Sequence, residues 1–480
     1  MPDRHDDVDS WLSERIDPLP PPPGTFELIK RRARRRKYRR LAFTATAAAV
    51  IVAAAVTVPQ VVSLPVVNSG RPAAAASSPT SARPTGVGNQ ASAGASAVPS
   101  PAALAPVPPN FRPTSVTFVG TETGWVIGQA GVAGHCATAF CTSVARTDDA
   151  GKTWSGVPAP LTGSPDGSTG VSGIRFLNTE DGWAFGPGLF ATRDGGRTWT
   201  PVGTGGLRVT DLETVGNRVF ALFASCTGSG PEFAAACTSF TLYSASAAAS
   251  TSASDWTPVG TSTSGLTDGT ADEAASLVLT GSRGFLLAPD RALYAGPVNG
   301  SGPWTLVNSI TPACPVGYAQ ADGQPAGALF AAVSGKELIL ACATVSGSRG
   351  SGASGGSGGS GGSRGSGGQQ KLIFSSPNGG TSWIQIATAP TAGITTSVAA
   401  SPAETVVLGT NQGIDVLPAG DITWQAANLA PAAAAAGGFS YVGMTTDEQG
   451  IALPANPAAG TVWFTFDGGL RWQPSRIASA

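Results

Sequence analysis

The chain has 480 residues, of which 41% are apolar and 12% charged, and it contains 64 glycines and 38 prolines. This apolar content is enough for a large core, whereas so few charges and so many turn formers exclude a protein built from amphipathic surface helices. The net charge of −1 conceals an asymmetry, because residues 1–40 carry 11 Lys and Arg against 7 Asp and Glu, which leaves 18 against 23 elsewhere. We therefore expect an all-β body with long linkers, and two chain ends that face different surroundings.

A basic run at residues 30–40 (KRRARRRKYRR) leads directly into an uncharged stretch, residues 41–62. The part of this stretch before Pro59 approaches the ~20 helical residues that cross ~30 Å of hydrocarbon. Cations that flank a span stay in the cytoplasm, so we expect a cytoplasmic leader at 1–40, a transmembrane helix at 41–62 in the cell membrane, and an extracytoplasmic remainder. A cleaved signal peptide is the alternative, because the stretch is rich in Ala and Thr and RRLAF resembles a twin-arginine signal.

The position of the basic run bears on its partners. Cations beside a membrane span are explained by topology and by anionic head groups, so no nucleic-acid partner is predicted. The leader resembles those of actinobacterial single-pass proteins, some of which regulate sigma factors. A disordered leader with no partner is the alternative, and both stay open.

Two segments have the composition of linkers. Residues 63–110 consist almost entirely of Ala, Pro, Ser, Thr, Gly and Val, which predicts a disordered stalk. Residues 346–370 form a Gly/Ser-rich tract with strand-like patterns on both sides, so we interpret it as a long flexible loop inside the body. The folded body is then expected at 111–480.

A tryptophan recurs after a turn-rich octet throughout this body. The seven positions are Trp154, Trp199, Trp256, Trp304, Trp383, Trp424 and Trp472. Three short apolar runs of strand type precede the typical Trp, as GIRFLN, GWAFG and LFATR precede Trp199, and a fourth strand is expected to start at the Trp itself. Seven such repeats predict a seven-bladed β-propeller with four-stranded antiparallel blades.

The octets themselves share a pattern. TDDAGKTW (147–154) and TRDGGRTW (192–199) match S/T-x-D-x-G-x-T-W in full, while SPNGGTSW (376–383) and TFDGGLRW (465–472) match it in part. This pattern resembles the Asp-box, or BNR repeat, of sialidases and of related propellers that include photosystem II assembly-factor-like proteins. The resemblance implies peripheral boxes at Thr147, Asp149, Gly151, Thr153 and Trp154; Thr192, Asp194, Gly196, Thr198 and Trp199; Asn378, Gly380 and Trp383; and Asp467, Gly469 and Trp472.

Physical reasons favour a structural role for these octets. Each Asp or Asn can accept hydrogen bonds from its own turn, each Gly can take a positive φ, and each Trp offers a large area for packing between blades. One carboxylate per turn is a poor cage for calcium, which takes about six to eight oxygen ligands. We assign no metal to them.

All six cysteines lie beyond the expected anchor, where disulfides can form. Six cysteines allow about 15 connectivities, but their placement in the repeat narrows the choice. Cys136 with Cys141 and Cys226 with Cys237 each lie between the second and third strands of a blade, and Cys342 ends the corresponding strand of the fifth blade, which leaves Cys314 as its partner. A zinc site at His135, Cys136 and Cys141 is not predicted, because a fourth ligand is missing.

A catalytic sialidase needs an arginine triad, a Tyr nucleophile with a Glu partner, and an acid/base Asp. Phe111, Arg112 and Pro113 resemble the F/Y-R-I-P segment of that family but lack its Ile. No tyrosine of the body (Tyr243, Tyr294, Tyr318 and Tyr441) stands in the family's context, and no spacing assembles a triad from Arg175, Arg208, Arg218, Arg283 and Arg291. We assign no catalytic residue and no cofactor.

The function that remains is a membrane-anchored extracytoplasmic propeller that binds a protein or a glycan without turning it over, in envelope assembly or signalling. The alternatives are an exo-sialidase-like glycoside hydrolase and a single-pass regulator with a sigma-factor-linked leader. The loops at 128–143 and 224–239 are candidate contact surfaces, since a stiffened loop loses less entropy on binding.

Overall fold

The computed structural model describes residues 105–131, 141–162, 170–226, 237–259, 275–314, 328–345, 369–431, 435 and 437–478. The expected leader, membrane span and most of the stalk lie outside these residues, as does most of the Gly/Ser-rich tract. No helix in the described ranges is both long enough and apolar enough to span a membrane. The short 3-10 helices that the described ranges contain are η2 (Ala247–Ala249), η3 (Ala253–Asp255) and η5 (Pro457–Ala459).

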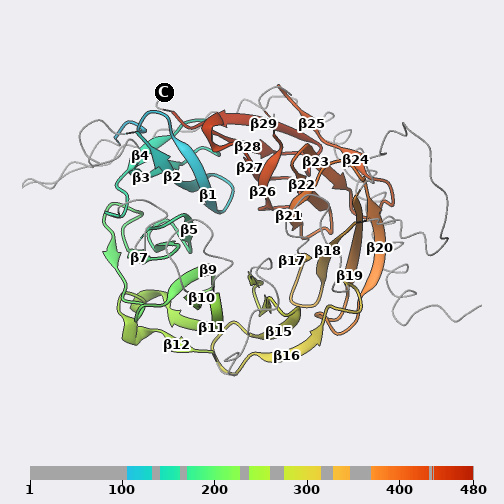
Figure 1. Cartoon of the computed structure of the whole chain (residues 1–480). Helices are drawn as coiled ribbons and strands as arrows, with labels where there is room; N and C mark the ends of the chain where they lie inside the picture. The colour runs from blue at the N-terminus through green and yellow to red at the C-terminus, as the bar shows by residue number, and fades with distance from the viewer. Residues whose placement is uncertain are drawn as a thin grey trace, which may run out of the picture. The chain divides into compact units, whose positions relative to one another are not determined.

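Strands follow one another along the chain in seven sheets (Figure 1). Blades 1 to 4 consist of β1 (Arg112–Val119), β2 (Thr123–Ala130), β3 (Cys141–Thr147) and β4 (Ser155–Val157); β5 (Gly173–Phe176), β6 (Gly182–Phe185), β7 (Leu189–Thr192) and β8 (Thr200–Pro201); β9 (Arg208–Val215), β10 (Arg218–Cys226), β11 (Cys237–Ser246) and β12 (Thr257–Pro258); and β13 (Ser276–Leu279), β14 (Arg283–Leu287), β15 (Ala292–Pro297) and β16 (Thr305–Ser309). Blades 5 to 7 consist of β17 (Ala328–Ala332), β18 (Leu338–Val345), β19 (Gln369–Ser376) and β20 (Ile384–Ala389); β21 (Thr395–Ala400), β22 (Val406–Thr410), β23 (Gly413–Leu417) and β24 (Gln425–Ala426); and β25 (Asn428–Leu429), β26 (Phe439–Met444), β27 (Gly450–Pro454), β28 (Thr461–Thr465) and β29 (Arg471–Arg476).

The predicted seven-bladed propeller of four-stranded antiparallel blades is confirmed. Within each blade the strands pair in chain order, and the fourth strand starts next to the repeated Trp, as expected. The last blade differs from the prediction in one respect, because β25 adds to it as a fifth strand, parallel to β29. Two residues are too few to show a strand pattern in a sequence, so this addition could not be foreseen.

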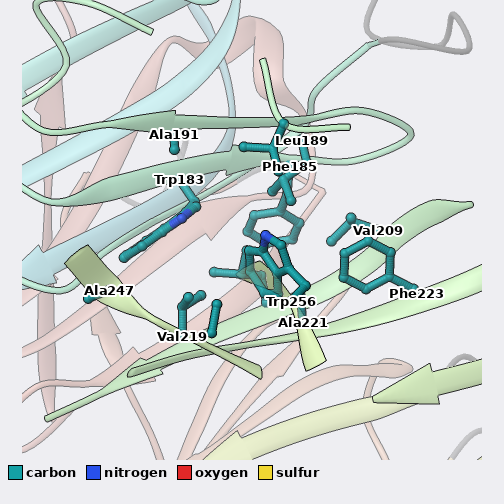
Figure 2. Close-up of a cluster of buried hydrophobic side chains, with 13 residues drawn as sticks. Trp183, Phe185, Leu189, Ala191, Val209, Val219, Ala221, Phe223, Ala247 and Trp256 are labelled. Atoms are coloured by element: carbon teal, nitrogen blue, oxygen red, sulfur yellow. The ribbon is translucent and has the colours of Figure 1, made fainter. Parts of the chain in front are cut away.

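Hydrophobic side chains gather in seven clusters, and each cluster fills the junction between two neighbouring blades. The junction of blades 2 and 3 is typical, with Trp183 and Phe185 facing Val219, Phe223 and Trp256 (Figure 2). Burial of such a side chain stabilises the fold by about 1.5–3 kcal/mol. The core is therefore distributed around the ring.

The repeated tryptophans all pack in the junction with the preceding blade. Two of them also donate a hydrogen bond across it, from Trp154 Nε1 to Ser475 Oγ (2.9 Å) and from Trp199 Nε1 to Pro158 O (2.9 Å). An indole has a large apolar area and one hydrogen-bond donor, so a Trp can both fill the junction and donate a hydrogen bond across it.

Four octet turns share one hydrogen-bond arrangement. In the first, Thr147 Oγ1 donates to Asp149 Oδ1 (2.8 Å) and accepts from Gly151 N (2.9 Å), while the same carboxylate accepts from Thr153 N (2.9 Å) and Thr153 Oγ1 (2.7 Å). Burial disfavours the charged carboxylate, but these hydrogen bonds outweigh it and lower the pKa of Asp149. Corresponding bonds recur at residues 192–198, 376–382 and 465–471.

Both the backbone conformation and the close packing require a glycine at the fifth octet position. At Gly380 φ is +92°, a conformation that L side chains rarely adopt, and an added Cβ would lie 2.1 Å from Leu293 Cδ2 of the preceding blade. Gly151 is constrained in the same way, with φ +80° and Phe464 of blade 7 at 2.4 Å from an added Cβ.

The ring closes without exchange of strands, since blade 1 comes entirely from β1–β4 and blade 7 from residues near the end of the chain. Side chains make the closure instead. Trp154 and Phe464 share one apolar cluster, Ser475 Oγ donates to Gly151 O, and Gln449 Nε2 donates to Thr121 O (2.7 Å).

Two predicted disulfides are confirmed. Cys226 and Cys237 face each other across β10 and β11, so this bond clips a hairpin as expected. Cys314, which follows β16, is bonded to Cys342 in β18, so the second disulfide ties blade 4 to blade 5. Cys136 lies outside the described residues, and its pairing with Cys141 stays a prediction.

The octet glycine gives a direct test of this packing. We expect Gly380→Ala to lower the free energy of unfolding by about 2–4 kcal/mol, because it combines backbone strain with overpacking against Leu293. Gly216→Ala is the matched control, since Gly216 has φ +62° but open space around it, and strain alone should cost about 1 kcal/mol. Equilibrium urea denaturation measures both, and equal losses would show that the contact with Leu293 contributes nothing.

Candidate functional site: the central cavity

The innermost strands of blades 2 to 7 surround a cavity of about 690 Å³. These strands are β5, β9, β13, β17, β21 and β26. Figure 1 shows β5, β9, β17, β21 and β26 around the centre of the propeller. The volume lies in the range of about 300–1,000 Å³ that is typical of ligand sites. The cavity is therefore our candidate site.

Its two sides differ in chemistry. Arg175 of β5, Asp211 and Glu213 of β9 and Tyr441 of β26 form an ionic wall, contributed by blades 2, 3 and 7. The opposite wall comes from blades 4 to 6 and, apart from Lys371, is made of side chains that are small or apolar, among them Ala275, Val278, Leu329, Ala331, Val398 and Ala399. An occupant with one polar and one apolar side would match both walls.

Arg175 is held in a fixed position at the ionic wall. Its Nε donates to Glu213 Oε1 (2.9 Å) and its Nη1 donates to Ile174 O (2.8 Å), so β5 and β9 are joined across two blades. The two charged side chains remain 20% and 27% exposed, which leaves both accessible from the cavity. Glu213 Oε2 accepts no hydrogen bond from the described residues.

Asp211 joins blade 3 to blade 4. Its Oδ1 accepts from Leu212 N and its Oδ2 from Leu277 N, each at 2.8 Å. Burial and the neighbouring charge of Glu213 raise the pKa of Asp211 to about 6, although the two N–H groups and Arg175 act in the opposite direction. This carboxyl therefore changes its charge near pH 6.

Tyr441 completes the ionic wall. Burial raises the pKa of its hydroxyl, and the charge of Arg175 offsets this only in part. The phenol stays protonated at neutral pH, so it can act as a hydrogen-bond donor to an occupant.

Lys371 of β19 also lines the cavity, at the junction of blades 5 and 6. It is 1% exposed, and its Nζ donates to Ala392 O at 2.5 Å. Burial lowers the pKa of Lys371, and the charge of Asp415 opposes that shift. This ammonium group is thus held by a hydrogen bond at the junction of blades 5 and 6.

Most of the residues that the sequence analysis singled out do not line this cavity. The octet residues form turns between third and fourth strands, and none of them lines the cavity. Arg175 is the one arginine in the described lining, and Tyr441 is the one tyrosine. Arg208, Arg218, Arg283 and Arg291 are not part of that lining, so the described lining of the cavity contains no arginine triad.

Sequence reasoning missed Asp211, Glu213 and Lys371. The alternation in RVTDLETV shows that Asp211 and Glu213 share a face opposite Leu212, but it does not show that this face borders the cavity. Within the described ranges no group of three or more His, Cys, Asp or Glu is arranged to hold a metal ion.

The chain was compared with protein families, curated proteins and solved structures, and it resembles only solved structures. No family model matches the chain, and no curated protein matches it. Among solved structures it is similar to YCF48 from Cyanidioschyzon merolae (14% identity, TM-score 0.42, 68% of this chain and 89% of that one) and to YCF48 bound to D1 peptide (15%, 0.45, 76% and 95%). It is also similar to a chain of a mitotic checkpoint complex (9%, 0.41, 82% and 99%). At such identities and TM-scores the likeness assigns no activity.

The position of Asp211 predicts a pH dependence of stability. The folded carboxyl keeps its proton to higher pH than an unfolded one, so between about pH 4 and about pH 6 the folded state binds more protons. Its contribution to the free energy of unfolding must then fall as the pH rises through that window. Relative to Asp211→Asn, the wild-type chain should lose about 1 kcal/mol across it, after allowance for solvent screening.

Urea denaturation at a series of pH values measures this slope. The Asn variant also changes a hydrogen bond that Leu212 N or Leu277 N donates, but that offset does not depend on pH. Asp421→Asn, at an exposed position outside the cavity, is the control and should follow the wild type. Parallel curves for the wild type and Asp211→Asn would refute the predicted titration.

Proposed function

We propose that this protein is a non-catalytic binding module that holds a segment of a protein partner in its central cavity. The observation that carries the proposal is a cavity of about 690 Å³ with an ionic wall facing an apolar wall. A polypeptide segment presents apolar and charged side chains in alternation, so it can satisfy both walls at once.

A glycan is the less favoured occupant. Sugar faces stack on exposed aromatic rings, whereas the described lining offers only Tyr441 and Phe330, of which Phe330 is 6% exposed. The small aliphatic side chains of blades 4 to 6 suit the side chains of a peptide better.

The chemistry of the ionic wall supports binding over hydrolysis. A sialidase-like enzyme would hold its substrate carboxylate with three arginines, but the described lining has Arg175 alone, and Glu213 already pairs with it. Burial keeps Tyr441 protonated, which suits a donor better than a nucleophile.

The cellular setting is part of the same proposal. The two disulfides support an oxidising, extracytoplasmic location for the propeller. We infer a transmembrane anchor at residues 41–62 and a cytoplasmic leader at 1–40, which would place the propeller at the outer surface of the membrane, in envelope assembly or signalling. The hydrogen bonds shared by four octet turns support the Asp-box interpretation and, with it, the sialidase-like propeller superfamily.

A cavity-filling variant tests the function. Ser276 lines the cavity from β13, and Ser276→Phe should block it; Ser301→Phe, at an exposed turn, is the matched control. On an array of tiled peptides and printed glycans, the full-length wild type and Ser301→Phe should retain peptides, whereas Ser276→Phe should bind them at least about tenfold more weakly.

A fluorogenic sialoside, assayed in parallel, should not be turned over. Turnover that Arg175→Ala abolishes would favour the hydrolase, and retention that is confined to glycans would replace the peptide with a sugar. Failure to retain any peptide, or peptide binding that Ser276→Phe leaves unchanged, would refute the central cavity as the binding site.

A further inference from the structure

The ionic wall of the cavity is not electrically balanced. Asp211 and Glu213 project from the same face of β9 as residues i and i+2, and one guanidinium group, that of Arg175, faces them from β5. Lys371 is bound to Ala392 O at the junction of blades 5 and 6, and the described lining from β13, β17 and β21 carries no titratable group. With both carboxylates ionised, the wall has an excess of one negative charge.

The two carboxylates also retain unused hydrogen-bonding capacity. Glu213 Oε2 has no donor among the described residues, and the two Asp211 oxygens each accept one backbone N–H although a carboxylate oxygen has two lone pairs. Both side chains border the cavity. A positively charged donor entering it would therefore find at least one oxygen with no competing partner.

The repulsion between the two acids adds a driving force. The charge of Glu213 contributes to the raised pKa of Asp211, so their proximity disfavours the doubly ionised state. A cation placed between them relieves this repulsion and gains charge-assisted hydrogen bonds. The surrounding apolar wall strengthens the attraction, because it excludes water from one side of the site.

We propose that Asp211 and Glu213 form a subsite for one cationic side chain of the partner segment, an inference that rests on the proposed function. The apolar wall of blades 4 to 6 then contacts the aliphatic side chains next to that cation. Arg175 is a positioning residue in this subsite, because its hydrogen bond orients Glu213 and its own positive charge cannot bind a cation. Tyr441 supplies a further polar contact from β26. The partner is accordingly a segment with a lysine or arginine flanked by apolar residues.

Three pentapeptides test this specificity by calorimetry on the full-length chain: acetyl-Ala-Leu-Lys-Leu-Ala-amide and its analogues with norleucine or Glu at the centre. Norleucine keeps the aliphatic stem of lysine and removes the charge. The Lys peptide should bind at least about tenfold more tightly than the norleucine peptide, and the Glu peptide should bind most weakly.

Substitutions and pH then assign the preference to the two acids. Asp211→Asn and Glu213→Gln should each reduce the Lys preference to within about twofold, whereas Glu448→Gln, at an exposed site outside the cavity, should leave it intact. In the unmodified chain, affinity for the Lys peptide should fall at least about fivefold from about pH 7.5 to about pH 5, with no such fall for norleucine. This second readout does not depend on whether a variant folds.

The outcomes separate the subsite from the proposed function. Equal binding of the Lys and norleucine peptides that Ser276→Phe abolishes would overturn the cationic subsite and leave the binding module standing. No measurable binding of the Lys peptide, or a Lys preference that survives both substitutions, would also overturn the subsite. A tighter Glu peptide would reverse the assigned charge of the partner.

Discussion

Packing on both faces of every sheet is the constraint on which the structure depends. In β10, Val219, Ala221 and Phe223 enter the junction with blade 2, whereas Phe220, Leu222 and Ala224 enter the junction with blade 4. Side chains alternate between the two faces of a strand, so a strand with no polar face needs an apolar neighbour on each side. A row of such sheets always leaves two faces uncovered, and only a closed ring covers them all.

Closure makes each blade dependent on the turns of its neighbours. In blades 1 to 4 an arginine guanidinium lies 5.0–5.9 Å from the centre of an aromatic ring of the second strand, in the pairs Arg146 with Trp125, Arg193 with Trp183, Arg218 with Phe220 and Arg283 with Phe285. Each of these arginines also approaches the turn between the third and fourth strands of the next blade, near Gly195, Ser250, Gly300 and Gly379 respectively. Arg218 and Arg283 each begin the second strand of their blade, whereas Arg146 lies in β3 and Arg193 follows β7. Because the four arginines do not share one position in the repeat, no single motif in the sequence marks these contacts.

The sequence was informative wherever a local pattern decides the structure. Octet spacing, strand-type runs and cysteine placement predicted the blades, the strand order and two disulfides, since each depends on residues that are close in the repeat. The ring closure through Ser475, Gly151 and Trp154 joins positions more than 300 residues apart, and no local signal predicts it. The cavity escaped prediction for the same reason: Arg175, Asp211 and Tyr441 lie in three different blades, and each alone has the character of an ordinary polar residue of a strand.

The distribution of the core also explains why the centre of the ring can carry charge. Stability comes mainly from the seven junctions, so residues that face the cavity are not needed to bury apolar area, and a wall of ions there costs the fold little. Asp211 nevertheless accepts N–H groups from both blades 3 and 4, and so couples the cavity to a junction, as the Arg175–Glu213 pair does for blades 2 and 3. Any occupant that changes the charge of this carboxyl acts at the same time on the contact between two blades. The ionic wall is thus the place where binding and the stability of the ring are linked.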